Sequence, residues 1–328
     1  PDWHSIGFYA APGEQISIES PSSIGDGLAV RIGCHSDTLW DLDSWKRVPE
    51  ICKTVQMDKA ITKISNPFGG LVYIVVPENC KLGRIKIIVS GAVNAPLYVL
   101  GKTNLSDWKN TIRSYPGPWA ELATDKVILT IPSEVIRKID DPESLMKFWD
   151  KVMDACADLA AWSRERPRPE RYVADRQISA GYMHSGYPIM TWLDVIQHEV
   201  DLDRLLKNTS GMDWGFFHEM GHNHQSGDWT FEGTGEVTEN LFSLYVLETV
   251  CGIKSSDTRE QMTTEGMAKA FKKYVDSGRS FETWKNDPFL ALAMYVQIKD
   301  EFGWDAYKKV FAEYKSLPDS ERPKTDNE

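Results

Sequence analysis

The pattern of apolar residues changes near residue 103, and this change restricts the folds open to the chain. Before it, short runs rich in Val and Ile recur between turn-forming residues, at 15–18, 28–32, 71–76, 84–89 and 97–100. Such runs predict a β-sandwich or a comparable antiparallel layer. After extended stretches at 126–131 and 171–179, most apolar residues follow helical spacing, at 145–159, 212–225, 235–251, 263–276, 288–302 and 304–315. The sequence therefore predicts an α+β fold, with a β-rich N-terminal subdomain of residues 1–103 and a mainly helical domain of residues 104–328.

Composition excludes several classes of protein. The 328 residues are 41% hydrophobic and 26% charged, which is typical of globular chains rather than of disordered ones. The 37 Lys and Arg residues are outnumbered by 48 Asp and Glu residues, and a net charge of −11 repels the phosphates of nucleic acids. The longest apolar runs fall well short of the ~20 residues that cross a bilayer, so we expect no membrane span. Because the chain begins with Pro1 rather than Met, we expect it to be a piece of a longer protein.

Residues 218–222 read His-Glu-Met-Gly-His, the H-E-x-x-H pattern. On a helix, residues four apart lie about 40° apart around the axis, so the imidazoles of His218 and His222 project from one face. Neutral imidazoles are good zinc ligands. Glu219, one residue after the first ligand, can hydrogen-bond a water on the metal without coordinating the metal itself. The segment therefore predicts a single catalytic Zn²⁺ ion, with Glu219 as the general base that assists the attack of water on a peptide carbonyl.

A catalytic zinc site needs a third protein ligand and an open fourth position. Four carboxylates follow the second histidine: Asp228, Glu232, Glu236 and Glu239. Asp228 would be brought round by a tight turn, but that arrangement favours Gly where Gln225 stands. Glu232 lies in a predicted loop, whereas Glu236 begins the next predicted helix and is our preferred ligand. Asn240 follows it on the same face, where it can hold a histidine ring through its second nitrogen.

The segments 218–225 and 235–241 resemble the enhancin-like zinc metallopeptidases, a gluzincin family that includes viral enhancins and mucin-degrading peptidases of gut bacteria. The resemblance extends to 7–14, 31–37, 66–74 and 179–188, and so covers most of residues 5–250. It implies a gluzincin-type catalytic domain with His218, His222 and Glu236 as zinc ligands and Glu219 as base. The family pattern often has Asn where Glu239 stands. The resemblance further implies cleavage of O-glycosylated, mucin-type proteins, recognition of their O-glycans, and a secreted or cell-surface location.

Candidate substrate-binding residues come from aromatic segments. The oxyanion that forms in peptide hydrolysis needs a donor besides the metal. The glycine- and aromatic-rich loop 180–188 offers Tyr182, His184 and Tyr187, with ordinary packing or a local loop contact as the alternative for each. Flat aromatic faces also suit pyranose rings, and among the twelve tryptophans we single out Trp229 as a candidate substrate wall.

Three functions remain open from the sequence. We prefer a secreted zinc endopeptidase that acts on O-glycosylated proteins. The second is a glycan- or partner-binding module with a peptidase-like fold and no turnover, against which the intact Glu219 counts, because a binder needs no general base. The third is a general zinc protease that uses Asp228 as its third ligand and ordinary peptides as substrates.

Overall fold

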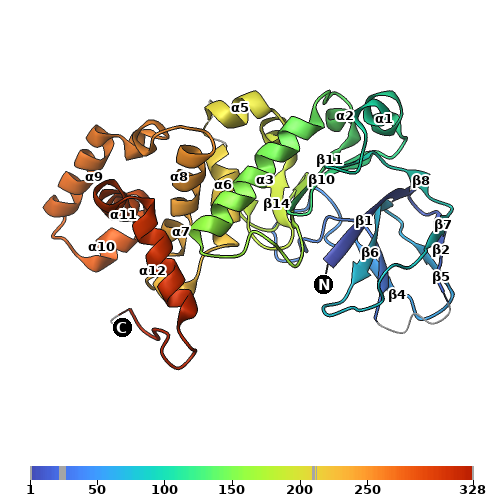
Figure 1. Ribbon diagram of the computed structural model, residues 1–328, viewed down its shortest axis with the longest axis horizontal. Helices are drawn as coiled ribbons and strands as arrows, with labels where there is room; N and C mark the ends of the chain where they lie inside the picture. Colours follow the sequence, from blue (N-terminus) through green and yellow to red (C-terminus); the bar gives the residue numbers. More distant parts are fainter. Residues whose placement is uncertain (1, 22–26, 209–210, 212, 327–328) are drawn as a thin grey trace. The chain divides into compact units, whose positions relative to one another are not determined.

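The computed structural model describes residues 2–21, 27–208, 211 and 213–326 (Figure 1). Contacts divide the chain into two units. Unit 1 comprises Pro1–Met146 and Pro167–Gln197, and unit 2 comprises Lys147–Arg166 and His198–Glu328. The two units are defined by contacts between residues and do not test the predicted domain boundary between residues 103 and 104, which stays a prediction.

Two antiparallel sheets form the N-terminal part of unit 1. One has the strand order β4-β3-β6-β1-β8 and the other β5-β2-β7. Ile16 and Ile18 of one sheet and Val30 and Ile32 of the other belong to one fully buried core. The predicted β-sandwich-like layer is therefore confirmed. Its strands are β1 (Asp2–Ala10), β2 (Gln15–Glu19), β3 (Ala29–Ile32), β4 (Lys53–Gln56), β5 (Ile61–Ser65), β6 (Gly70–Val76), β7 (Ile88–Ser90) and β8 (Val93–Asn94).

A six-stranded mixed sheet completes unit 1, in the order β13-β14-β12-β11-β10-β9. The middle strands β11, β12 and β14 run parallel, whereas β10 and β13 pair antiparallel with their neighbours β11 and β14. The predicted extended stretches 126–131 and 171–179 overlap β11 and β12. The strands are β9 (Leu97–Val99), β10 (Trp119–Ala123), β11 (Val127–Pro132), β12 (Glu170–Asp175), β13 (Met183–His184) and β14 (Ile189–Trp192), with short helices α1 (Leu105–Asn110) and α2 (Ser133–Ile136) beside them.

A buried ionic network ties the sandwich to the mixed sheet within unit 1. Arg171 of β12 is fully buried and pairs with Glu121 of β10. Tyr73 of β6 and Thr130 of β11 each donate a hydrogen bond to the same Glu121 oxygen at 3.0 Å. Removing one partner of such a pair leaves a buried charge uncompensated, which costs about 3–5 kcal/mol. The sandwich therefore completes the polar core of the adjoining sheet.

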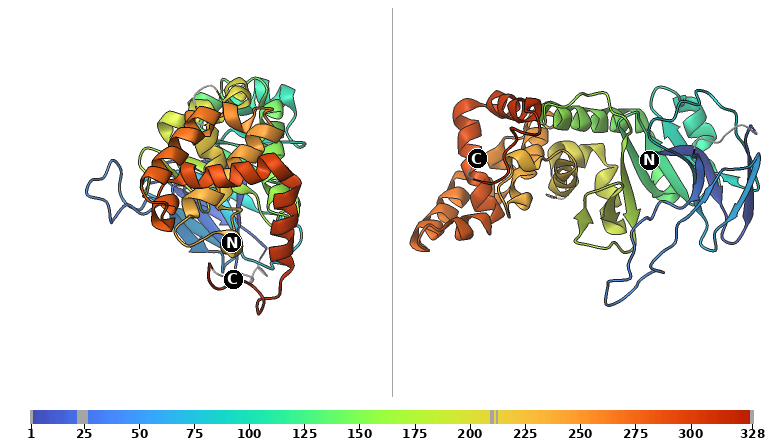
Figure 2. Two further views of the ribbon diagram at one scale, coloured as in Figure 1. Left: turned by 90° about the vertical axis from the view of Figure 1, so that its left-hand side faces the viewer. Right: turned by 90° about the horizontal axis from the view of Figure 1, so that it is seen from below.

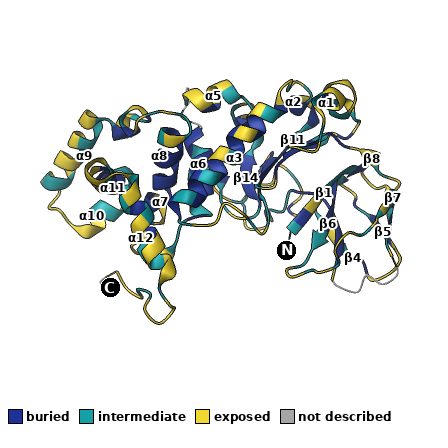
Figure 3. Ribbon diagram, in the orientation of Figure 1, coloured by how far each residue is buried: buried dark blue, intermediate teal, exposed yellow. Residues whose placement is uncertain are grey.

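Unit 2 is helical, which confirms the predicted α+β class. Helices α6 and α8 form its buried centre, and α9 to α12 group together toward the C-terminus (Figures 2 and 3). No helix of the described residues is long and apolar enough to cross a membrane. The helices are α3 (Pro142–Leu159), α4 (Ile196–Glu199), α5 (Leu202–Lys207), α6 (Asp213–His222), α7 (Gly235–Thr238), α8 (Asn240–Thr249), α9 (Thr264–Asp276), α10 (Phe281–Lys285), α11 (Pro288–Phe302) and α12 (Trp304–Ser316); the first residues of α3 and α4 belong to unit 1.

Candidate metal centre

Helix α6 is held in place by its aromatic residues and by one glycine. Phe216 and Phe217 are fully buried, with ring centroids 6.1 and 6.3 Å from that of Trp149 on α3. Gly221 faces the junction of α7 and α8, where a Cβ atom would collide with the backbone carbonyl oxygen of Glu239. A side chain at this position would separate the two segments. The glycine inside the H-E-x-x-H pattern therefore permits the close approach that the site needs.

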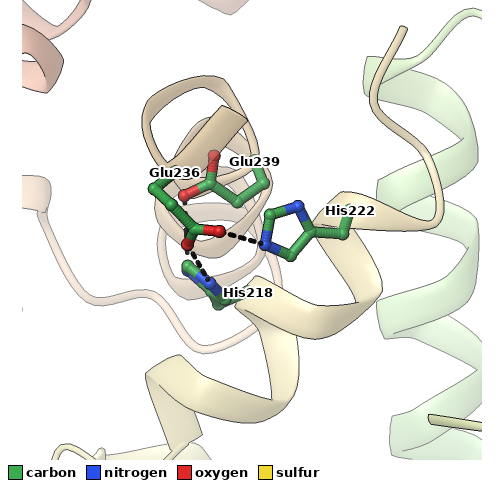
Figure 4. Close-up of side chains that lie close together, drawn as sticks. All are labelled: His218, His222, Glu236 and Glu239. Atoms are coloured by element: carbon green, nitrogen blue, oxygen red, sulfur yellow. Dashed lines mark ion pairs between the residues drawn. The ribbon is translucent and has the colours of Figure 1, made fainter. Parts of the chain in front are cut away.

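The site itself is a cluster of His218, His222, Glu236 and Glu239, whose ligand atoms lie within 4.8 Å of one another (Figure 4). The carboxylate of Glu236 contacts both rings, at 3.2 Å from His218 Nε2 and 3.5 Å from His222 Nε2. Its backbone leaves the helical range, with φ −89° and ψ 19°, a region where active-site residues often lie. Glu236 is 67% exposed, so this side of the cluster is open to solvent.

The other side of the His218 ring is closed by hydrogen bonds. Its Nδ1 atom lies 2.9 Å from Asn240 Oδ1 and 3.3 Å from Glu239 Oε1, both of which are buried. Asn240 in turn donates to the carbonyl oxygen of Glu236 at 3.0 Å and to Glu239. These contacts leave Nε2 facing Glu236. Glu239 therefore lies behind the ring, away from the Nε2 atoms that the two histidines share with Glu236.

The electrostatic environment of the cluster favours a positively charged group among its carboxylates. Burial disfavours the charged form of His218, but hydrogen bonds to Glu236 and Asn240 outweigh it and raise the pKa of His218 to about 9. Hydrogen bonds from the two rings hold the pKa of Glu236 far below its usual range. Burial raises the pKa of Glu239 to about 8. Two imidazoles and one ionised carboxylate around a shared space are a donor set that suits zinc.

Glu219 lies on α6 next to His218 in sequence. It is 8% exposed, and its charge contributes to the raised pKa of His218, so its carboxylate is within electrostatic reach of that ring. It is not one of the four clustered residues.

Asp228 and Glu232 lie outside the cluster. Asp228 lies in the 3₁₀ turn Gly227–Trp229, where it accepts a hydrogen bond from Arg322 Nη1 at 2.6 Å. Glu232 is exposed in the following loop. The structure therefore favours Glu236 over both as the third ligand.

The four candidate substrate residues have partners of their own. Trp229 stacks on Phe311 of α12, with centroids 4.0 Å apart. In unit 1, Tyr182 donates to Asp194 at 2.7 Å and His184 Nε2 lies 2.7 Å from Asp37. The ring of Tyr187 lies under the guanidinium of Arg168 at 3.6 Å and its hydroxyl bonds to Asp2. Because these three belong to unit 1 and the cluster belongs to unit 2, their role toward a substrate stays a prediction.

Gln225 is a site residue that the sequence analysis missed. Its Oε1 atom lies 3.3 Å from His222 Nδ1, and its Nε2 donates to the Gly235 carbonyl at 3.0 Å and to the hydroxyl of Thr238. One side chain thus orients the second histidine and fastens the segment that carries Glu236. The only signal of this role in the sequence is the position of Gln225, three residues after His222. We considered that position only as one where the arrangement with Asp228 as ligand favours glycine.

We expect Gln225→Ala to lower the affinity of the chain for zinc by about 10–100-fold, the usual cost of losing a hydrogen-bonded partner of a metal ligand. Competition with a chromogenic chelator measures this affinity directly. Gln261→Ala, at an exposed position on a 3₁₀ turn, is the matched control. Equal zinc affinity in the two variants would show that Gln225 does not position His222.

An α+β fold that presents the two histidines of an H-E-x-x-H helix and a glutamate of the next helix defines a class, the gluzincin-type metallopeptidases. A family model for peptidase M60, enhancin and enhancin-like, matches residues 91–328. A model for the N-terminal domain of M60-like peptidases matches residues 1–90. The chain therefore belongs to the M60, enhancin-like peptidase family, as the resemblance in its sequence indicates.

Two groups of known proteins are similar to the chain. The TRPM8 channel-associated factor homolog of Xenopus laevis is 43% identical over 317 residues, 96% of this chain and 34% of the relative. TRPM8 channel-associated factor 2 of Mus musculus is 41% identical over 318 residues, again 96% of this chain and 34% of the relative. The chain thus spans about a third of the length of these curated relatives.

Among solved structures, a protein of unknown function from Bacillus anthracis has a TM-score of 0.77 at 26% identity, over 99% of this chain and 64% of that one. IMPa from Pseudomonas aeruginosa, solved with an O-glycopeptide, has a TM-score of 0.61 at 18% identity, over 94% and 41%. The M60 catalytic domain of Clostridium perfringens ZmpC, solved with the sialyl T antigen, has a TM-score of 0.55 at 17% identity, over 75% and 52%. At 17–18% identity, the IMPa and ZmpC structures show only that they share the fold of this chain.

Proposed function

We propose that the chain is a zinc-dependent endopeptidase that hydrolyses peptide bonds in O-glycosylated, mucin-type proteins. The observation that carries the proposal is the convergence of His218 Nε2, His222 Nε2 and the Glu236 carboxylate, with Glu219 on the same helix as the two histidines. Family membership supports the reaction class.

The three converging side chains would hold the ion. Two imidazole nitrogens and one glutamate oxygen are the ligand set of catalytic zinc sites that keep a fourth position for water or substrate. Bound zinc supplies a Lewis acid that polarises the scissile carbonyl and lowers the pKa of water to about 7. Asn240 and Gln225 hold the Nδ1 atoms, so that both Nε2 atoms point to the shared space.

Glu219 carries the proton transfers. Its carboxylate accepts a proton from the attacking water and delivers it to the amine that leaves, as a general base and then a general acid. Low exposure keeps this carboxylate largely out of bulk water, which strengthens its electrostatic interactions with the reacting groups. Tyr182, His184 and Tyr187 remain our candidates for the oxyanion donor, and Trp229 for a substrate wall.

The substrate class rests on the family resemblance and on two structures of the same fold. IMPa was solved with an O-glycopeptide and the ZmpC domain with the sialyl T antigen. Substrates of this kind are extracellular, which agrees with the secreted or cell-surface location that we predict.

A second candidate function is partner binding without turnover. The relatives at 41–43% identity are named channel-associated factors, which favours an interaction role. The presence of Glu219 beside a complete set of ligands favours hydrolysis, because binding alone requires no general base.

We expect the chain, loaded with zinc, to cut a mucin-type glycoprotein at discrete sites that disappear after enzymatic removal of the O-glycans. Mass spectrometric mapping of new termini measures this. A sample whose cuts persist after deglycosylation would be a general protease. Tight binding of the glycoprotein without any cut would favour the binding module instead.

A further inference from the structure

A concave site apart from the metal cluster lies in unit 2, between α11, α12, the turn 227–232 and residues 323–326. Its volume is about 820 Å³, which is within the range of about 300–1,000 Å³ of small-molecule sites. We call it the aromatic pocket, after the aromatic side chains that line it: Trp229, Phe231, Tyr295, Tyr307, Phe311 and Tyr314. It shares no residue with the cluster around His218.

Tyr295 supplies a buried polar group to the lining of this pocket. The residue is 8% exposed, and its hydroxyl has no hydrogen-bond partner among the residues that the structure describes, although its backbone carbonyl accepts a hydrogen bond from Tyr307 at 2.8 Å. Burial and the charge of Asp326 raise the pKa of Tyr295 to about 12, so the Asp326 carboxylate is within electrostatic reach of the hydroxyl. A buried hydroxyl without a partner is unfavourable, and a bound polar group would relieve this cost.

The ionisable groups of the lining are mainly acidic: Asp228, Glu232 and Asp326 against Lys324. Asp228 is neutralised by Arg322 at 2.6 Å, and Lys285, which binds Glu282 at 2.7 Å, is also within electrostatic reach of Glu232 and Asp326. The Asp326 carboxylate accepts the backbone N–H of Glu232 at 2.9 Å, which fixes it at the rim. The aromatic walls therefore border on the Asp326 carboxylate, which is within electrostatic reach of the Tyr295 hydroxyl.

We propose that the aromatic pocket binds a small organic ammonium ion with an apolar body. The N–H groups of the cation would donate to the Tyr295 hydroxyl and to the Asp326 carboxylate, and its apolar body would lie against Trp229 and Phe311. Aromatic faces attract cations, and aromatic boxes recognise ammonium ligands for this reason. A neutral ligand of the same shape would fill the walls but could not form a charge-assisted hydrogen bond with the Asp326 carboxylate.

Calorimetric titration of the full chain with 2-phenylethylammonium, and with the isosteric neutral 2-phenylethanol, tests the proposal. We expect saturable binding of the cation and at least about tenfold weaker binding of the alcohol, as charge-assisted hydrogen bonds are worth more than neutral ones. Tyr295→Phe, which keeps the ring, and Asp326→Asn should each weaken the cation about fivefold. Asp276→Asn is the control, since it removes one exposed acid on α9 that does not line the pocket.

Each other outcome overturns the proposal. Equal affinity for the cation and the alcohol would define a merely apolar pocket. Equal effects of Asp326→Asn and Asp276→Asn would reduce the preference to net charge. Absence of saturable binding by a chain whose thermal unfolding is normal would remove the site. Because no arm measures hydrolysis, the result is independent of the proposed peptidase activity.

Discussion

Replacing Glu236 by alanine is expected to abolish stoichiometric zinc binding and, with it, hydrolysis. Within the part of the chain that the structure describes, this carboxylate is the one acid that contacts the Nε2 atoms of both histidines, so its loss leaves two imidazoles to hold the ion. The expected loss of zinc affinity exceeds the ~10–100-fold that removal of a hydrogen-bonded partner costs. Metal content after gel filtration, measured by mass spectrometry, gives the result.

Asp228→Ala is the matched control for this prediction. Asp228 pairs with Arg322 and lies outside the cluster, so this variant should retain one zinc ion per chain. The opposite pattern, with zinc lost from Asp228→Ala and kept by Glu236→Ala, would establish the third function that the sequence left open, a general protease with Asp228 as ligand.

Glu219→Gln is expected to keep zinc and to lose most of the hydrolytic rate. The amide matches the carboxylate in shape but cannot accept the proton of water, and general base catalysis contributes about 10²–10⁴-fold. Initial rates on a glycoprotein substrate, together with metal content, separate the two effects. Glu265→Gln, at an exposed acid in the first turn of α9, should leave both unchanged. Undiminished turnover by Glu219→Gln would assign the base to another group.

The local spacing of residues was sufficient to predict the two histidine ligands from the sequence, but not the rest of the site. A separation of four residues on one helix places the side chains of His218 and His222 on the same face, whatever packs around them. The choice among four later carboxylates depends on where the chain returns, and the structure favours Glu236 because the junction of α7 and α8 packs against α6 at Gly221. The hydrogen bond that His218 Nδ1 donates to Asn240 Oδ1 follows from the same packing.

Gln225 and Glu239 are site residues whose roles no local sequence pattern predicts. The contacts of Gln225 with His222, Gly235 and Thr238 exist only because a turn brings two segments together. Glu239 is one of four candidate carboxylates in the sequence, and the structure shows it fully buried behind His218 with a raised pKa. Neither the burial of a single acid nor a turn of this kind produces a characteristic residue spacing in the sequence.

The fold shows the same division between local and non-local features. Strong helical spacing gave α11 (Pro288–Phe302) at its observed bounds. The mixed sheet was visible only in part, because strands such as β10 and β14 are short and paired with distant segments. The buried pair of Arg171 and Glu121 that supports this sheet joins residues 50 positions apart, and no local pattern announces it.

The most direct test of the account is a crystal structure of the zinc-loaded chain with an anomalous difference map at the zinc edge. We expect one peak held by His218 Nε2, His222 Nε2 and Glu236, with Zn–N distances of about 2.0–2.1 Å and a non-protein fourth ligand. Glu239 should remain hydrogen-bonded on the Nδ1 side of His218. A peak at which Glu239 closes the coordination sphere, or one that Glu236 does not touch, would contradict it.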